Sequence, residues 1–214
     1  MIRHVLLDAD GVMQRGVGSF LETMQRHLGE DAIEFLTRSF PEDGPVLRGE
    51  AEVVPLLAAA LLERGSDADA EQLFTEVWLA IEVLPESIAL ARSLRASGLG
   101  VHLGTNQDSS RAAYMKAELG YADVFDTSFY SCDLGCAKPS AAFFDRVVAE
   151  LGVDPDEVLF VDDSQPNVDG ARGAGLHAER WEIDEGMPAL RDLLAAHGLA
   201  VPDQRDRGSE PPQD

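Results

Sequence analysis

Near the start of the sequence stands the run His4-Val5-Leu6-Leu7-Asp8-Ala9-Asp10-Gly11-Val12, in which apolar residues lead directly into two acids. The segment from His4 to Leu7 has the composition of a short buried β-strand. A carboxylate at the end of such a strand is costly unless a cation or hydrogen-bond donors stabilise it. We therefore predict a β-strand whose carboxyl end, at Asp8 and Asp10, forms part of a charged binding site.

Later segments repeat this pattern of a short apolar run followed by polar residues, at 101–104, 127–131, 158–161 and 177–181. Segments with helical periodicity separate them, such as the one that ends at Gly120 and the one that ends at Gly152. Short strands that alternate with helices are typical of a parallel sheet with crossover connections. The sequence thus predicts an α/β protein with a doubly wound, mainly parallel sheet.

The interval between the first strand and the next is far too long for one crossover helix. It contains several amphipathic helical patterns, the first of which begins at the capping pair Ser19 and Glu22. We predict an inserted, all-helical cap over residues 14–84, an α/β core made of residues 1–13 and 85–201, and a disordered tail over 202–214. Ligands bind at the carboxyl ends of parallel strands, so we expect this cap to act as a lid over the site.

The composition limits the partners of the protein. The 214 residues carry a formal net charge of −22 and the pI is about 4.4, which argues against nucleic acid and anionic membranes, because both need a positive face. No apolar stretch reaches the roughly 20 residues of a membrane span and no signal peptide is recognisable, so we expect a cytoplasmic protein. Cys132 and Cys136 are then expected to be reduced thiols. The sequence does not decide whether the protein forms a homodimer. An exposed apolar patch on the cap would be needed to argue for one.

Polar residues follow the later strands at the positions where ligand-binding loops are expected. Thr105 and Asn106 come directly after the strand 101–104, Lys138 precedes a predicted helix, and Asp162 and Asp163 end the strand 158–161. The carboxyl ends of parallel strands meet at one edge of the sheet. We therefore expect these residues to lie close to the two acids of the first strand.

The two acids of the first strand can take different roles in catalysis, one as a nucleophile and the other as a proton donor and acceptor. With a magnesium ion present, the Asp8 carboxylate can attack phosphorus and form an aspartyl phosphate. Asp10 lies two residues further on, and its side chain can protonate the leaving alcohol and later deprotonate a water molecule. We also expect both residues to bind the metal, Asp8 through its carboxylate and Asp10 through its backbone carbonyl.

The remaining residues complete a site for a metal and a phosphoryl group. Asp163 is predicted to be a direct metal ligand and Asp162 a direct or water-mediated one, and hard oxygen ligands of this kind fit Mg²⁺ best. Thr105 and Asn106 can hold phosphoryl oxygens at the start of a helix. Lys138 would supply a positive charge to the nucleophile and to the transferring group.

Each of these elements also has an ordinary structural explanation. Asp-Gly is usually a turn, Thr-Asn is often a helix cap, Lys-Pro is often a solvated helix start, and two adjacent acids can cap a helix. Their joint order at successive strand ends favours the functional interpretation over these alternatives.

The four groups together resemble the motifs of the haloacid dehalogenase superfamily of hydrolases, matched here by Asp8-x-Asp10, Thr105, Lys138 and Asp162-Asp163. The likeness extends from Ile2 to about Trp181, and the insert stands where that family has its helical cap. Longer stretches resemble in particular the bacterial α-glucose-1-phosphate phosphatases and the phosphatase domain of soluble epoxide hydrolases; they cover residues 84–106, 133–139 and 160–175.

This resemblance implies a magnesium-dependent phosphatase that hydrolyses a small phosphomonoester metabolite, with a sugar phosphate favoured, through an aspartyl-phosphate intermediate. It implies Asp8 as nucleophile and Asp10 as acid and base. The dehalogenases of the superfamily lack the second acid, so the presence of Asp10 argues against dehalogenation. The phosphonate hydrolases carry a lysine in the cap, whereas residues 14–84 contain none.

Other functions stay open at this point. A sugar-phosphate mutase shares all four motifs, and a non-catalytic phosphate-binding scaffold could retain them. A phosphate sensor similar to a response-regulator receiver domain also combines acids with a hydroxyl and a lysine, but such domains are shorter and lack a helical insert. Arg15 and Arg48, in or beside the cap, are interpreted as solvated surface residues. The alternative is that they contact a second anionic or hydroxyl group of a substrate.

Overall fold

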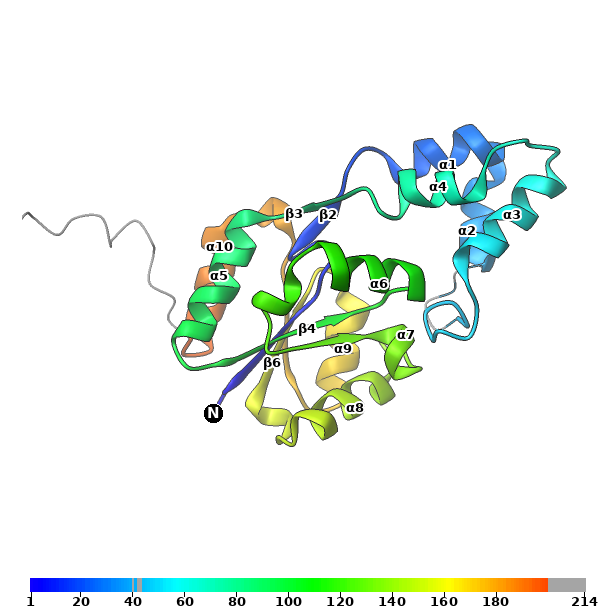
Figure 1. The fold of residues 1–214 in the computed structure, drawn as a ribbon. Helices are drawn as coiled ribbons and strands as arrows, with labels where there is room; N and C mark the ends of the chain where they lie inside the picture. The colour runs from blue at the N-terminus through cyan, green and yellow to red at the C-terminus, as the bar shows by residue number, and fades with distance from the viewer. Residues whose placement is uncertain (40, 42–43, 200–214) are drawn as a thin grey trace, which may run out of the picture.

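The computed structural model describes residues 1–39, 41 and 44–199. Its central sheet consists of five parallel strands in the order β5-β4-β1-β6-β7 (Figure 1). These strands are β1 (His4–Leu7), β4 (Gly100–Thr105), β5 (Thr127–Tyr130), β6 (Val158–Asp162) and β7 (His177–Arg180). The prediction of a doubly wound parallel sheet is confirmed.

Helices cover both faces of the sheet, which gives the core three layers (Figure 1). One face packs against α5 (Pro85–Ala96), α6 (Ser109–Glu118) and α10 (Gly186–Ala196), and the other packs against α8 (Ala141–Leu151) and α9 (Gln165–Gly173). Strand β1 lies in the middle, and its side chains alternate between the two hydrophobic clusters: Val5 and Leu7 join one, and Leu6 joins the other. A strand buried on both faces explains the uninterrupted apolar run in the sequence.

The connections between strands leave the sheet in opposite directions at β1 and β6. From β1 the chain continues to β4 and β5 on one side, and it then crosses to β6 and β7 on the other. Ligands bind at such a switch point, at the carboxyl ends of the strands. Asp8 directly follows β1 and Asp162 ends β6, so both acids lie at the switch point.

Short elements complete the core. Helix α7 (Ser131–Leu134) follows β5, and 3₁₀ turns lie at Gly29–Asp31, Tyr121–Asp123, Pro155–Glu157 and Ile183–Glu185. The predicted helix stop at Gly152 is confirmed, because this glycine adopts the left-handed conformation at the end of α8 and its N–H bonds to the Val148 carbonyl.

Between β1 and β4 the chain forms a cap of four described helices (Figure 1). They are α1 (Phe20–Leu28), α2 (Ala32–Ser39), α3 (Val53–Glu63) and α4 (Ala70–Val77). The cap has a hydrophobic cluster of its own, in which Met24, Leu57 and Phe74 are buried. Ser19 caps α1 as predicted, since its hydroxyl accepts the backbone N–H of Glu22 at 3.2 Å.

The expectation of an all-helical insert needs one correction. The two ends of the segment 14–84 pair as an antiparallel ribbon of β2 (Gln14–Gly16) and β3 (Ile81–Val83), which joins the cap to the core (Figure 1). Three-residue strands are too short to show the two-residue hydrophobic period by which a strand is recognised in a sequence. The predicted tail, residues 202–214, lies outside the described residues. None of the helices in the described part combines the length and the apolar character needed to cross a bilayer.

Candidate active site

The side chain of Lys138 lies at the centre of a buried charged cluster. Its Nζ is 2.8 Å from Asp8 Oδ1 and 2.6 Å from Asp162 Oδ2, and the side chain is 1% exposed. Burial lowers the pKa of the Lys138 ammonium, but the two carboxylates outweigh burial and the pKa is raised overall. Lys138 is therefore a permanent positive charge between the carboxyl ends of β1 and β6.

The carboxylate of Asp162 accepts hydrogen bonds from several donors. Besides Lys138, its carboxylate accepts the backbone N–H of Ser164 at 2.8 Å and the Asn167 amide at 3.0 and 3.1 Å. A carboxylate with this many donors is fixed in place, so Asp162 in turn fixes the position of the Lys138 ammonium. Sequence reasoning missed Asn167, which lies in the first turn of α9, five residues after Asp162.

Three acids lie close enough to share one cation. Oxygen atoms of Asp8, Asp162 and Asp163 all lie within 4.8 Å of one another. Against three carboxylates the cluster has the single ammonium of Lys138, which leaves two negative charges uncompensated when all three acids are ionised. Only hard oxygen donors are present, and the charge excess matches a divalent ion, so the residues fit Mg²⁺.

Two acids of this cluster, Asp8 and Asp163, have raised pKa values. Burial raises the pKa of Asp8 to about 8, with Lys138 lowering it and Asp162 raising it. Burial and the neighbouring Asp162 also raise the pKa of Asp163. A cation beside these carboxylates would favour their charged forms, which is the form that a nucleophile and a metal ligand need.

Gly11 allows the turn after β1 to approach the acids of β6. It adopts a positive φ of +80°, and a Cβ at this position would overlap the carboxylate of Asp163. Any larger residue would therefore strain the backbone and displace a metal-ligand candidate. This close approach explains why the acidic turn of the first strand contains glycine.

Thr105 and Asn106 lie where predicted, at the carboxyl end of β4. Thr105 is buried, and its hydroxyl accepts the Gln107 amide at 2.9 Å. The Asn106 side chain forms a reciprocal pair with the backbone of Lys138, donating to its carbonyl and accepting its N–H, each at 2.8 Å. Asn106 thus positions the lysine in this structure, and phosphate binding by Thr105 and Asn106 stays a prediction.

The carboxylate of Asp10 contacts Arg111. The guanidinium makes two parallel bonds, Nη1 to Oδ2 at 2.7 Å and Nη2 to Oδ1 at 2.8 Å. Amides of Gln14 and Gln107 add bonds of 3.0 and 2.8 Å. Although burial raises the pKa of Asp10, Arg111 and the amide donors outweigh it and lower the pKa.

Arg111, Gln107 and Gln14 are site residues that sequence reasoning missed. Gln107 directly precedes Asp108, the N-cap residue of α6, and Arg111 lies in the first turn of that helix, where its Nη1 donates to Gln107 Oε1 at 2.9 Å. Their position directly after Thr105-Asn106 is the signal that could have identified these two residues.

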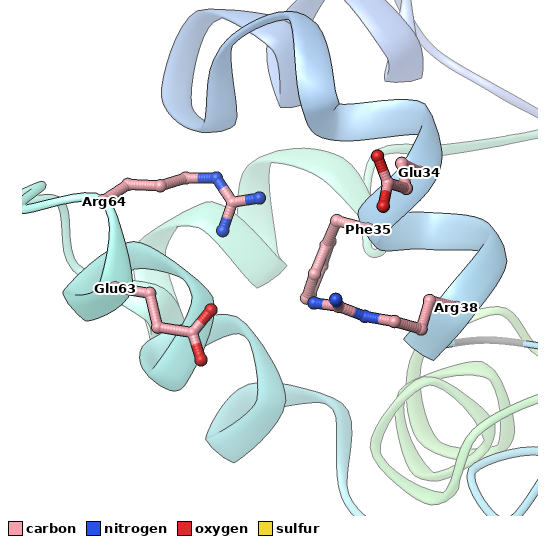
Figure 2. Close-up of a pocket in the computed structure, with 5 residues that line it drawn as sticks. All are labelled: Glu34, Phe35, Arg38, Glu63 and Arg64. Carbon is pink, nitrogen blue, oxygen red and sulfur yellow. The ribbon is translucent and has the colours of Figure 1, made fainter.

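Two other features of the chain lie apart from this chemistry. Cys132 and Cys136 are free thiols, and burial together with Asp133 raises the pKa of Cys132 to about 11, which disfavours a reactive thiolate. A cavity of about 310 Å³ lies inside the cap between α2 and α3 (Figure 2). Its Arg64 donates to the carbonyls of Leu28 and Ala60 and lies over the Phe35 ring, so this arginine serves the packing of the cap.

Comparisons with known proteins agree with this geometry. The family model of the haloacid dehalogenase-like hydrolases matches residues 2–175. A phosphoglycolate phosphatase of Rhodospirillum rubrum is 27% identical over 192 residues, which cover 82% of this chain and 78% of the relative. A phosphatase of Mycobacterium tuberculosis is 30% identical over 194 residues, which cover 83% of this chain and 86% of the relative.

A solved structure shows the same fold. The HAD family enzyme of Bacteroides thetaiotaomicron, crystallised with magnesium and inorganic phosphate, superposes with a TM-score of 0.72 at 21% identity, covering 89% of this chain and 99% of that one. The family match spans most of the chain and includes all four groups of site residues. The chain therefore belongs to the haloacid dehalogenase-like hydrolases and is an enzyme of the phosphatase type.

Proposed function

We propose that this protein is a magnesium-dependent phosphatase that hydrolyses a small phosphomonoester through an aspartyl phosphate on Asp8. The observation that carries the proposal is the buried cluster in which Lys138 lies 2.8 Å from Asp8 and 2.6 Å from Asp162, with Asp163 beside them. A nucleophilic carboxylate, a fixed positive charge and a cation site are the components that phosphoryl transfer requires.

The proposed reaction has two steps. A carboxylate oxygen of Asp8 attacks phosphorus, the bond from phosphorus to the ester oxygen breaks, and Asp10 gives a proton to the departing alcohol. In the second step Asp10 takes a proton from water, the water oxygen attacks phosphorus, and the bond between Asp8 and phosphorus breaks to release inorganic phosphate. Lys138 stabilises the negative charge of the phosphoryl oxygens in both steps.

The metal site would consist of Asp8, the backbone carbonyl of Asp10, and Asp163. Asp162 lies within reach of the same ion, but its bonds to Lys138, Ser164 and Asn167 support a positioning role. A bound Mg²⁺ neutralises the phosphoryl oxygens and keeps two like-charged groups, the nucleophile and the substrate, from repelling each other. Thr105 and the backbone at Asn106 would contact the phosphoryl oxygens.

The substrate is proposed to be a small phosphorylated metabolite. The preference for a sugar phosphate rests only on the resemblance noted in the sequence, and the phosphoglycolate phosphatase relative suggests a phosphorylated acid instead. A sugar-phosphate mutase and a non-catalytic scaffold stay as alternatives. The cytoplasmic location and the oligomeric state likewise stay predictions.

The test is the variant Asp8→Asn, assayed for hydrolysis of p-nitrophenyl phosphate with Mg²⁺. We expect hydrolysis to be abolished while circular dichroism and the unfolding midpoint show a folded protein, because the amide keeps the size of the carboxylate. The matched control is Asp145→Asn, at an exposed position of α8, which should retain full activity. Turnover by Asp8→Asn at the wild-type rate would disprove the mechanism.

A further inference from the structure

A cleft of about 360 Å³ lies between the cap and the residue that caps α6 in the core. Of its described lining residues, only Asp108 belongs to the core, where it caps α6 by accepting the Arg111 N–H at 3.0 Å. Trp78, at the end of α4, lines the cleft from the cap side, and its carbonyl accepts Arg111 Nε at 2.8 Å. Two lining residues of the cleft thus hydrogen-bond to Arg111, the arginine that also holds the Asp10 carboxylate.

The cap side of the cleft is apolar. Phe20 and Trp78 form an edge-to-face pair with ring centroids 5.0 Å apart, and the half-buried Leu47 lies on the same side. Val46 and Val53 stand behind this wall, buried in the hydrophobic cluster of the cap. Phe20 remains 43% exposed although it is a large aromatic residue. An exposed aromatic ring at the wall of a cavity is well placed to bury the apolar part of a ligand.

The described lining residues supply little to bind a polyol or a second anion. Their polar side-chain groups are the Thr37 hydroxyl, the Asp108 carboxylate and the indole N–H of Trp78, and the carboxylate would repel a negatively charged group. A substrate with several hydroxyl groups would lose its hydrogen bonds to water on entering such a cleft. This lining disfavours both a sugar body and a carboxylate-bearing body.

The two arginines considered from the sequence are directed elsewhere. Arg15 pairs with Glu82 at 2.6 Å, and Arg48 pairs with Glu50 at 2.9 Å. Neither belongs to the described lining of the cleft. The interpretation of both as surface residues is thus favoured by their contacts with neighbouring glutamates.

We propose that the cleft binds an uncharged, apolar alcohol portion of the phosphomonoester, aliphatic or aromatic, against Phe20, Leu47 and Trp78. This inference rests on the proposed function and narrows its substrate class. The cleft volume lies near the lower end of ordinary ligand pockets, so the alcohol portion is small. The proposal departs from the sugar phosphate that the sequence resemblance favours.

The first experiment measures kcat/KM of the wild-type protein with Mg²⁺ for the n-alkyl phosphates from ethyl to hexyl, and for glucose 1-phosphate, glucose 6-phosphate and phosphoglycolate. We expect kcat/KM to rise roughly two- to fourfold with each added methylene, and hexyl phosphate to exceed the three polar substrates. A flat alkyl series with better hydrolysis of a polar substrate would overturn the inference and leave the proposed function intact. Absence of hydrolysis for every ester would overturn the proposed function itself.

The second experiment locates the effect in the cleft. Phe20→Ala should lower the ratio of kcat/KM for hexyl phosphate to that for glucose 1-phosphate by about tenfold. The matched control is Leu62→Ala, which removes a side chain that is 79% exposed on α3 and should leave the ratio unchanged. Leu47→Gln, which puts an amide at a half-buried position of the cleft, should lower the ratio in the same direction. Equal ratios in wild type, Phe20→Ala and Leu47→Gln, with all three proteins folded, would refute the assignment.

Discussion

Arg111 joins the proposed acid and base, Asp10, to the cap. Its guanidinium makes a bidentate pair with the Asp10 carboxylate at 2.7 and 2.8 Å, while its Nε donates to the carbonyl of Trp78 at the end of α4. Charge-assisted bidentate pairs are strong and directional. The orientation of Asp10 is therefore tied to the segment that leads from the cap back to the core.

A first prediction concerns the variant Arg111→Met. Without the guanidinium, the Asp10 carboxylate keeps only amide donors and loses its fixed orientation, so proton transfer to the leaving alcohol should become less efficient. We expect kcat for an alkyl phosphate to fall by about tenfold or more. The fall for p-nitrophenyl phosphate should be smaller, because its leaving group needs little protonation.

The control for this prediction is Arg95→Met. Arg95 also pairs with an aspartate, Asp126, at 2.7 Å, but the pair lies near the start of β5, away from the acidic cluster. This variant should leave both rates unchanged. Equal losses for the two esters in Arg111→Met would contradict a role of Arg111 in positioning the acid.

A second prediction compares the two lysines of the chain, of which one is buried and the other is exposed. Each lies 2.6 Å from an aspartate, but the Lys138 side chain is 1% exposed and the Lys116 side chain is 46% exposed. Lys138→Met would leave Asp8 and Asp162 buried without their cation, so the free energy of unfolding should fall by about 3 kcal/mol or more in EDTA. Lys116→Met should cost less than about 1 kcal/mol, because exposed pairs contribute little.

Urea denaturation of both variants provides the measurement. Adding Mg²⁺ should restore part of the stability of Lys138→Met, since a divalent ion can replace some of the lost positive charge beside the carboxylates. An equal loss of unfolding free energy in the two variants would show that Lys138 stabilises the folded protein no more than the exposed Lys116 does.

The sequence was sufficient to predict the parts of the site that depend on strand ends. Asp8, Asp162 and Asp163 follow or end segments whose apolar run marks a buried parallel strand. Lys138, which joins them, lies in the connection between β5 and α8. Their proximity is a consequence of topology, and topology can be inferred from the alternation of short strands and helices.

The orientation of individual side chains could not be predicted in the same way. The Asp10 carboxylate, predicted as acid and base, contacts Arg111, a residue 101 positions away along the chain that the sequence did not indicate. The Asn106 amide is paired with the backbone of Lys138, a contact that was likewise not predicted, and its phosphate binding stays a prediction. The hydrogen-bond partner of each side chain depends on which groups of distant segments lie nearby in the fold. Such contacts leave no periodic pattern in the sequence.

A third prediction concerns magnesium. Because Asp8, Asp162 and Asp163 offer three carboxylates to one cation, Mg²⁺ should raise the thermal unfolding midpoint of the wild-type protein, and EDTA should remove both this gain and the activity. Asp163→Asn should reduce the Mg²⁺-dependent gain, while Asp169→Asn, at an exposed position of α9, should keep it. A gain of the same size in both variants would exclude Asp163 as a metal ligand.

A fourth prediction concerns His102, which lies in β4 beside the central strand β1. The ring is 3% exposed, its Nε2 is 3.1 Å from His4 Nδ1, and its Nδ1 is a buried atom without a hydrogen-bond partner in the described structure. Burial lowers the pKa of His102 to about 4, with His4 lowering it further and Asp126 raising it. The folded protein therefore keeps this ring neutral at pH values where the unfolded chain would protonate it.

The consequence for stability has a definite sign. Between pH 6.5 and about 4 the unfolded state binds one more proton at His102 than the folded state, so the free energy of unfolding falls as the pH falls through this window, by about 3 kcal/mol in total. The variant His102→Leu lacks this group and should not lose that part of its stability at low pH. Its free energy of unfolding, relative to that of the wild type, should therefore increase as the pH is lowered from 7 to 4. His177→Leu, at an exposed position of β7, is the matched control and should follow the wild-type curve. Urea denaturation at several pH values measures the three curves, and parallel curves for His102→Leu and wild type would show that the buried ring does not titrate as inferred.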